Sequence, residues 1–200
     1  MNTKPNWINI YRNALTKEEC ENVIKFSRKK FFKQPLLSGD GHGRTSSQFF
    51  IEKGLDVVSK IEEFTASNLP TYNELNLTIK NQEPTSVVMY EKGEQYKAHW
   101  DYFHPQLHPK EYEAFVAHGN SNRVATAIFY LNDSFEGGET YFPKIDFKIK
   151  PELGMCVTFT NMFSDDEFNG ESLHAGLPVI SGEKYICLLY TSDAADDLLC

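Results

Sequence analysis

The sequence predicts an α+β fold that is mainly β, with helices first and a strand-rich core after them. Two segments in the first 70 residues place apolar side chains at helical spacing. From Thr85 onward, short runs rich in β-branched and aromatic residues alternate with turn signals such as E-G-G-E and I-S-G-E. This order is typical of helices that support an antiparallel barrel or sandwich.

Each helix is predicted from its apolar spacing and its boundary signals. The first spans residues 16–31, because Thr16 and Glu19 form a capping-box pattern ahead of an amphipathic run. That run carries Cys20, Val23, Ile24 and Phe26. The second helix is predicted from a similar recurrence before an N-L-P break, in Leu55, Val58, Ile61, Phe64 and Leu69. The G-D-G-H-G-R stretch between the helices is predicted to be a loop.

One long connection interrupts the strand-rich half. Residues 103–122 include H-P-Q-L-H-P-K-E-Y-E and separate two predicted core strands. Two interpretations are open. The segment is either a loop that covers a functional site or a surface insertion with a short helix over residues 109–117.

Composition indicates a single domain with a proper core, since 200 residues are 40% hydrophobic and 14% aromatic. Residues 1–83 are expected to form a helical and strand support region of that domain. Residues 84–190 are expected to form its core. The final T-S-D-A-A-D-D-L-L-C, residues 191–200, fits neither part and is expected to be a tail of doubtful origin.

Charge and hydropathy argue against several classes of protein. A net charge of −8 and a pI near 5.3 disfavour a nucleic-acid groove, which needs clustered lysine and arginine. The chain has no apolar run of about 18 residues, and its start, M-N-T-K-P-N-W, lacks the apolar core of a signal peptide. The sequence therefore predicts a soluble protein, cytoplasmic or otherwise intracellular, without a nucleic-acid or membrane partner.

Most cysteines and histidines are predicted to have no functional role. The cysteines show no C-x-x-C spacing and are expected to be reduced thiols, in Cys20, Cys156, Cys187 and Cys200. Cys156 and Cys187 lie in apolar strand patterns, where a cysteine behaves as a small buried hydrophobe. Four histidines fall in polar or proline-bearing stretches and are expected in exposed loops, at His42, His104, His108 and His118.

Three other residues carry the functional prediction: His99, Asp101 and His174. Alternate residues of a strand face the same side, so His99 and Asp101 can both point inward while Trp100 points away. Two imidazoles and one carboxylate form the facial triad that holds Fe(II) and leaves positions open for oxygen chemistry. An H-x-D pair is common by chance, so the prediction depends on the sequence after the third histidine.

Lys184 follows His174 by ten residues (184 − 174), across the S-G turn of H-A-G-L-P-V-I-S-G-E-K. A turn there is expected to return the chain antiparallel and bring the ammonium beside the metal. Fe(II) oxygenases of this type commonly use 2-oxoglutarate, whose distal carboxylate a cation can anchor. The alternative is a solvated surface lysine. Lys184 opens the apolar run K-Y-I-C-L-L-Y, however, which indicates a buried strand.

Four ordered segments closely resemble the prolyl 4-hydroxylase family of 2-oxoglutarate/Fe(II) dioxygenases. They are Y-E-K-G-E-Q-Y-K-A-H-W-D-Y-F (90–103), R-V-A-T-A-I-F-Y-L-N-D (123–133), E-G-G-E-T-Y-F-P (136–143) and H-A-G-L-P-V-I-S-G-E-K (174–184). An upstream R-T-S-S, residues 44–47, is similar to the family's pre-catalytic element. The resemblance covers most of residues 10–190. It implies a double-stranded β-helix, or jelly roll, backed by N-terminal helices.

The resemblance also implies a role for each candidate residue. It implies that Fe(II) is ligated by His99, Asp101 and His174. It implies that 2-oxoglutarate is bound by Lys184, with Thr140, Tyr90 and Tyr130. Near the substrate it places Tyr96, Arg123 and Tyr190. Relatives usually carry a tryptophan at the position of Tyr190, so this chain keeps an aromatic wall there with a different ring, which could change the accepted peptide.

The activity that the resemblance implies is hydroxylation of proline, by habit of the family at C4, in a peptide or protein. Fe(II), 2-oxoglutarate and O2 are the implied cofactors, with ascorbate as reductant and succinate as a product. Asp101 favours hydroxylation, because related halogenating enzymes carry a small residue in its place. Two alternatives stay open: the same chemistry on a free amino acid or small molecule, and a metal-binding jelly-roll module without turnover.

Overall fold

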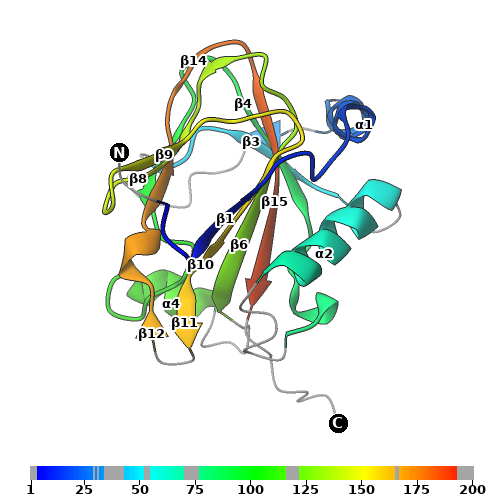
Figure 1. Cartoon of the computed structure of the whole chain (residues 1–200). Coiled ribbons are helices and arrows are strands. Elements are labelled where there is room, and N and C mark those ends of the chain that lie inside the picture. The colour runs from blue at the N-terminus through cyan, green and yellow to red at the C-terminus, as the bar shows by residue number, and fades with distance from the viewer. Residues whose placement is uncertain are drawn as a thin grey trace.

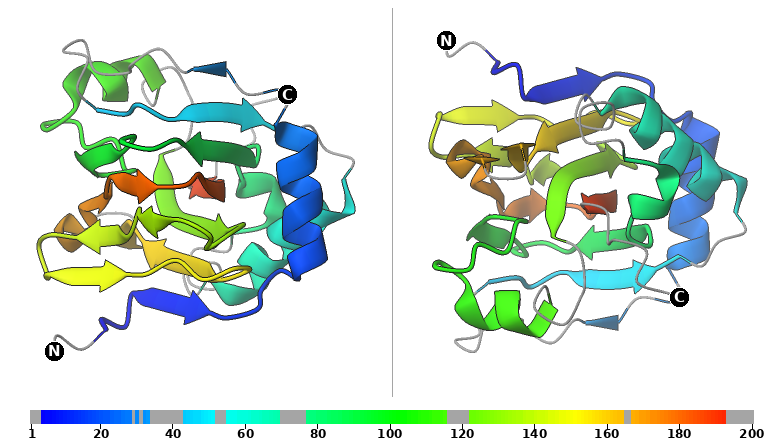
Figure 2. Two further views of the ribbon diagram at one scale, coloured as in Figure 1. Left: turned by 90° about the horizontal axis from the view of Figure 1, so that it is seen from above. Right: turned by 90° about the horizontal axis from the view of Figure 1, so that it is seen from below.

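The computed structural model describes residues 4–28, 30, 32–33, 43–51, 55–69, 77–115, 122–164 and 167–192. Two antiparallel β-sheets form the body of the molecule, and two N-terminal helices pack beside them (Figure 1). Seen from above and from below, the strands lie one beside another, and α1 runs across the ends of several of them (Figure 2). This arrangement confirms the predicted mainly β jelly roll with helical support.

The larger sheet has seven strands, and every pairing in it is antiparallel. In spatial order the strands are β1 (Ile8–Tyr11), β10 (Cys156–Thr160), β6 (Arg123–Tyr130), β15 (Lys184–Ser192), β4 (Ser86–Tyr90), β3 (Ser47–Phe50) and β2 (Phe32–Lys33). Strands from both ends of the chain therefore share one sheet. β15 includes Thr191 and Ser192, the first two residues of the segment that the sequence assigned to the tail.

The smaller sheet contains the strands that carry the predicted histidine ligands. Its order is β5 (Tyr96–His99), β13 (His174–Gly176), β8 (Thr140–Phe142) and β9 (Phe147–Ile149). Two short pairs extend the structure, β7 (Glu136–Gly137) with β14 (Val179–Ser181) and β11 (Met162–Ser164) with β12 (Glu167–Phe168). Two 3-10 helices connect elements, η1 (Ile79–Asn81) and η2 (Gly170–Ser172).

The helices begin where the sequence predicts and end differently in one case. α1 (Lys17–Ser27) has Thr16 as its N-cap, with both hydrogen bonds of the capping box to Glu19. It ends before residue 31, because Phe32–Lys33 pairs with β3 and draws the chain into the sheet. α2 (Asp56–Asn68) confirms the second predicted helix. No helix in the described ranges is long and apolar enough to cross a membrane.

The two faces of the larger sheet bury two separate cores, because alternate residues of each strand point to opposite sides. The outer face packs Phe129, Cys187 and Leu189 against α1 and α2. The inner face packs Tyr130, Ile186 and the neighbouring residues toward the smaller sheet. Cys20, Cys156 and Cys187 are free and buried, as expected, whereas Cys200 lies outside the described residues.

The turn before Lys184 does not pair the two strands that it joins, although Lys184 lies in the same cavity as His99, Asp101 and His174. β14 pairs with β7, whereas β15 pairs with β4 and β6 in the other sheet. The chain therefore passes from the two-stranded sheet of β7 and β14 to the larger sheet between Ser181 and Lys184. The physical reason is that the apolar run after Lys184 is buried on both faces only at a central position of the larger sheet.

The long connection after β5 contains a short helix, α4 (Pro109–Phe115), which is close to the helix predicted over residues 109–117. Residues 116–121 lie outside the described ranges. His104 and His108 are partly buried rather than exposed, because both pack against aromatic rings. The ring centroids of His104 and Phe168 lie 5.2 Å apart, and those of His108 and Trp100 lie 6.0 Å apart. His42 and His118, and most of the predicted G-D-G-H-G-R loop, lie outside the description.

Candidate active site

The fold brings His99, Asp101 and His174 together although 73 residues separate the last two (174 − 101). One potential ligand atom from each lies within 4.8 Å of the others. Strand pairing produces this meeting, since His174 at the start of β13 stands opposite His99 at the end of β5. Asp101 lies two residues beyond the end of β5, not within the strand as predicted. A bend there turns its carboxylate toward both imidazoles.

Backbone carbonyls fix the orientation of the two imidazoles. His99 Nδ1 lies 2.8 Å from the Lys97 oxygen, and His174 Nδ1 lies 2.9 Å from the Ser172 oxygen. An Nδ1–H that donates to a carbonyl leaves the Nε2 lone pair available to a metal. These Nε2 atoms lie 3.4 Å and 3.6 Å from the Asp101 oxygens, for His99 and His174 respectively. The three donors therefore face one common point.

A buried hydrogen-bond chain holds the Asp101 carboxylate. The Thr126 hydroxyl donates to Asp101 Oδ2 at 2.7 Å, and the Asn161 amide donates to the Thr126 hydroxyl at 3.0 Å. Thr126 and Asn161 are fully buried. Neither residue was predicted from the sequence. For Thr126, the sequence did contain an indication of its role. It lies in the apolar run V-A-T-A-I-F, and a hydroxyl buried in such a run needs a hydrogen-bond partner.

The electrostatics of the three donors suit a divalent cation. Burial lowers the pKa of His174 to about 4, so its imidazole is neutral at pH 7, as a ligand must be. Burial by itself raises the pKa of Asp101, but His174 and His99 outweigh it and hold that pKa well below its ordinary value. Two neutral imidazoles and one carboxylate are the donor set of non-haem Fe(II) sites. The residues present therefore fit iron.

A narrow cavity leads from these donors to Lys184. His99, Asp101, His174 and Lys184 all line it, together with Tyr90, Thr140, Tyr96 and Tyr190. The cavity is small, with a free volume of about 30 Å³. The cavity lies between the two sheets, because Lys184 and Tyr90 belong to the larger sheet and Thr140 to the smaller one.

Lys184 is a buried lysine without a carboxylate within salt-bridge distance among the described residues. Its ammonium donates to the Gly138 carbonyl at 2.7 Å and lies 5.2 Å from the centre of the Tyr90 ring. Burial lowers the pKa of Lys184 to about 7, an effect that the Glu139 carboxylate only partly opposes. Beside it, the hydroxyls of Tyr130 and Thr140 share a hydrogen bond of 2.6 Å. An incoming carboxylate would meet a cation and several hydroxyls here.

The three residues predicted near the substrate also lie close to the donors. The Tyr96 ring stacks on His99 with centroids 3.6 Å apart. Tyr190 lines the cavity and Arg123 does not. The Arg123 guanidinium lies 3.6 Å from the centre of the Tyr190 ring. Two hydrogen bonds, of 2.7 and 3.0 Å, tie Arg123 to Glu83. Glu83 was missed, because nothing in N-Q-E-P-T links it to a residue 40 positions away.

The R-T-S-S segment that was noted for its resemblance lies beside this group. Arg44 donates to Ser46 at 2.5 Å and to Gln48 at 2.7 Å. It forms an isolated antiparallel bridge with Tyr96, and its guanidinium lies 5.3 Å from the centre of the Tyr96 ring. The segment thus supports the tyrosine that stacks on His99.

Comparison with known proteins agrees with this fold. Residues 85–192 match the family model described as the 2OG-Fe(II) oxygenase superfamily. A putative prolyl 4-hydroxylase of Acanthamoeba polyphaga mimivirus is 32% identical over 90% of this chain and 72% of its own length. Prolyl 4-hydroxylase 5 of Arabidopsis thaliana is 30% identical over 88% of this chain, and the match covers 65% of that relative.

A solved structure is similar over nearly the whole chain. It is the viral collagen prolyl hydroxylase from Paramecium Bursaria Chlorella virus-1, in complex with 2OG. The TM-score is 0.75 at 28% identity, and the match covers 94% of this chain and 97% of that one. A jelly roll with a two-histidine, one-carboxylate centre and this family match defines a 2OG-Fe(II) oxygenase. Within that superfamily, the chain belongs to the prolyl 4-hydroxylase family.

Proposed function

We propose that this protein is a 2-oxoglutarate- and Fe(II)-dependent dioxygenase that hydroxylates proline, at C4, in a peptide or protein. The observation that carries the proposal is the convergence of His99, Asp101 and His174 at one end of a cavity that also contains Lys184. A metal triad and a buried cation are the two groups that this chemistry needs from a protein. Membership of the prolyl 4-hydroxylase family supports proline as the target.

In this proposal, the Nε2 atoms of His99 and His174 and one oxygen of Asp101 hold the iron. When bound, Fe(II) supplies the oxygen activation that a C–H hydroxylation requires. The protein's part is to fix the donors and leave the other coordination positions free. Thr126 contributes by engaging Asp101 Oδ2, so that Oδ1, which carries no such hydrogen bond, is the oxygen best placed for the metal.

Lys184 anchors the distal carboxylate of 2-oxoglutarate. The ammonium exchanges the Gly138 carbonyl for that carboxylate, and Tyr90, Thr140 and Tyr130 supply hydroxyls around it. The keto-acid end then points to the triad, because the cavity runs between the two groups. With O2 as the oxidant, the cosubstrate would be converted to succinate and carbon dioxide, and ascorbate would be the accompanying reductant.

The proline substrate approaches from the side of Tyr96 and Tyr190. The Tyr96 ring packs against His99, so it can shield the metal and contact the proline ring at once. Arg123 positions the Tyr190 ring from behind and is itself held by Glu83. These aromatic surfaces suit a pyrrolidine ring, which is apolar and flat enough to lie against them.

The experiment that tests this function supplies Fe(II), 2-oxoglutarate, oxygen and a proline-containing peptide. We expect succinate release together with a gain of one oxygen atom on the proline. Both should disappear in His174→Ala and Asp101→Ala. Free proline, offered in place of the peptide, gives the comparison with a small substrate. Succinate release that follows free amino acids but not peptides would overturn the peptide assignment, and no release from metal-loaded protein would overturn the activity.

A further inference from the structure

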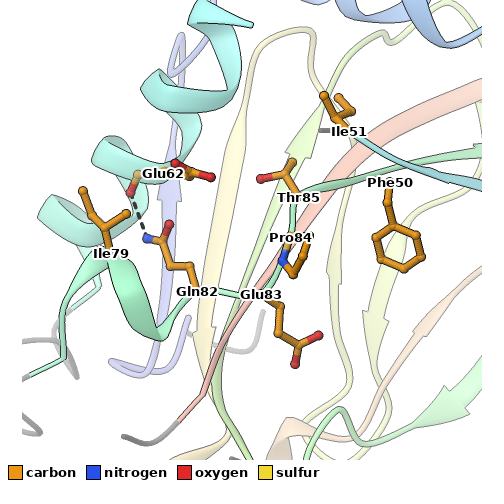
Figure 3. Close-up of a pocket in the computed structure, with 8 residues that line it drawn as sticks. All are labelled: Phe50, Ile51, Glu62, Ile79, Gln82, Glu83, Pro84 and Thr85. Carbon is orange, nitrogen blue, oxygen red and sulfur yellow. Dashed lines mark hydrogen bonds between the residues drawn. The ribbon is translucent and has the colours of Figure 1, made fainter. Parts of the chain in front are cut away.

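A second cavity lies beside α2, and none of the proposed metal ligands lines it. It opens between α2, η1 and the segment that leads into β4, with a volume of about 460 Å³ (Figure 3). Its walls combine apolar and polar side chains: Phe50, Ile51, Glu62, Ile79, Gln82, Glu83, Pro84 and Thr85. No role proposed above uses this space.

Two polar groups point into the cavity from opposite walls. The Glu62 carboxylate comes from α2, and the Thr85 hydroxyl comes from the segment before β4 (Figure 3). Thr85 is 1% exposed, and its hydroxyl has no hydrogen-bond partner in the part of the chain that the structure describes. The Glu62 side chain likewise forms no ion pair within that part. A buried hydroxyl without a partner is costly unless a ligand or water completes it.

The apolar walls are unusually exposed. Phe50 is 49% exposed and Ile79 is 40% exposed, and both line the cavity. Gln82 is fixed beside them by a hydrogen bond from its amide to the Glu62 carbonyl at 2.9 Å. The cavity therefore offers an apolar surface that leads to one carboxylate and one hydroxyl.

A short series of contacts connects this cavity to the candidate active site. Glu83 lines the cavity and binds Arg123 through both carboxylate oxygens. Arg123 stacks on Tyr190, which lines the metal cavity. The backbone N–H of Glu83 also donates to the Tyr190 carbonyl at 2.9 Å. Glu83 and Arg123 thus separate the second cavity from Tyr190, and an extended peptide advances about 3.3 Å per residue, so the occupant would be a residue a few positions from the proline.

We propose that this second cavity is a subsite for a lysine or arginine of the substrate peptide, a few residues from the proline that is hydroxylated. The inference rests on the proposed function and adds a preference for basic residues flanking the target. The aliphatic part of the side chain lies on Phe50 and Ile79, and its cationic end meets Glu62 and Thr85.

The charge of the site selects the cation. Glu83 is already neutralised by Arg123, so Glu62 is the carboxylate available to a ligand. The lining residues contribute no cation that would attract an acidic side chain. Lysine and arginine also match the mixed walls, because both carry an apolar stem behind the charge. Glu62 and Thr85 together can accept two hydrogen bonds from an ammonium or guanidinium.

The test uses peptides with one proline in a neutral host sequence and one lysine moved through successive positions on either side. Norleucine at the same positions keeps the stem without the charge. Turnover is followed by succinate release and by the mass of the hydroxylated peptide. We expect lysine at one or two positions to lower KM about fivefold relative to norleucine, the size of a half-exposed ion pair, with little change in kcat.

Matched variants locate the effect. Glu62→Gln should abolish the lysine preference, whereas Glu63→Gln, which removes the same charge from the next, exposed position of α2, should keep it. Thr85→Val tests the hydroxyl and should reduce the preference in part. Glu62→Lys should convert the preference to one for glutamate at the same position. Unchanged turnover of the norleucine peptide would show that each variant is folded and active.

Two results would overturn the subsite. One is equal KM values for lysine and norleucine at every position in the unaltered protein. The other is a lysine preference that persists in Glu62→Gln. Both are distinct from failure of the proposed function, in which no peptide is hydroxylated, whether or not it carries a lysine.

Discussion

Thr126 determines which oxygen of the Asp101 carboxylate, the proposed metal ligand, is free of its hydrogen bond. Its hydroxyl donates to Asp101 Oδ2, and Asn161 in turn donates to that hydroxyl. All three residues are buried, so water does not compete for these bonds. A carboxylate with one oxygen engaged binds a metal through the other one, which keeps coordination positions open for the cosubstrate.

We therefore predict that Thr126→Val weakens metal binding about tenfold or more, the effect usual for a partner that orients a ligand. Thr126→Ser keeps the hydroxyl and should restore most of the affinity. Anaerobic Mn(II) titration followed by electron paramagnetic resonance measures this without turnover. If the valine variant, shown to be folded by circular dichroism, bound Mn(II) as tightly as the unaltered protein, Thr126 would have only a packing role.

As the proposed anchor of 2-oxoglutarate, Lys184 would give cosubstrate binding a pH dependence of defined sign. Burial lowers the pKa of Lys184 to about 7, so the free protein loses this charge as the pH rises through 7. A dicarboxylate binds the charged form. Above pH 7, binding must therefore include the uptake of one proton, and the affinity for 2-oxoglutarate should fall by up to about tenfold per pH unit. Below pH 7, this group should contribute no further change.

Isothermal titration of 2-oxoglutarate into the anaerobic Mn(II) protein between pH 7 and 9 measures this slope. Lys184→Met is the control, because its binding should be weak and should lack the slope. The number of protons taken up, obtained from buffers of different ionisation enthalpy, gives an independent value. An affinity in the unaltered protein that stays constant from pH 7 to 9 would contradict the prediction.

Among the elements, the turn that leads into β10 tolerates only glycine at one position. Gly154 has φ +72°, and a Cβ there would lie 2.1 Å from the Leu15 carbonyl oxygen. The same residues are joined by a hydrogen bond of 3.0 Å from the Leu15 N–H to the Gly154 carbonyl. The turn is thus pressed against the segment before α1, and this contact attaches the helical layer to the larger sheet.

Gly154→Ala is predicted to lower the free energy of unfolding by about 3 kcal/mol, from backbone strain together with the clash. Gly93→Ala is the matched control. Gly93 has φ +84° with no heavy atom within 4 Å of the added Cβ, so strain alone should cost about 1 kcal/mol. Urea unfolding of both variants measures the difference. Equal losses would show that the contact with Leu15 adjusts without cost.

The elements could be predicted from the sequence where local signals determine them. The capping box at Thr16 and the apolar spacing of α2 are such signals, and both helices begin as expected. The pairing of strands could not be predicted from local signals in the sequence. The S-G turn before Lys184 has the local chemistry of a hairpin, yet the strands on its two sides pair with other strands, because burial of β15 is decided by the whole fold.

The candidate site shows the same limit. The metal site was predictable because histidine and aspartate are common metal ligands. The structure brings His99, Asp101 and His174 together. Thr126, Asn161 and Glu83 have common residue types, and their partners lie 25, 35 and 40 positions away. Only the register between β6, β10 and the segment before β4 joins them. Such contacts depend on strand pairing at long range, which one sequence does not encode locally.

For the molecule as a whole, the candidate active-site cavity lies between the two sheets and is lined by residues of both. The proposed metal ligands belong to the smaller sheet and its extension, whereas Lys184, Tyr90 and Tyr130 belong to the larger one. Metal alone would thus tie together parts of one sheet. Metal with 2-oxoglutarate would connect both sheets through one continuous set of contacts, and a ligand that binds only the folded state stabilises it.

This arrangement predicts two separable increments in thermal stability. At a concentration 100 times its Kd, each ligand should add about 2.7 kcal/mol, or roughly 5–10 °C in Tm for a chain of this length. Differential scanning calorimetry with Mn(II), then with Mn(II) and 2-oxoglutarate, measures both increments. Lys184→Met should keep the metal increment and lose that of 2-oxoglutarate, whereas His174→Ala should lose the metal increment. Because bound 2-oxoglutarate would contact both sheets, we expect the molecule to unfold as one unit and more slowly when it is bound. Two separate calorimetric transitions in the fully loaded protein would contradict a cavity that spans both sheets.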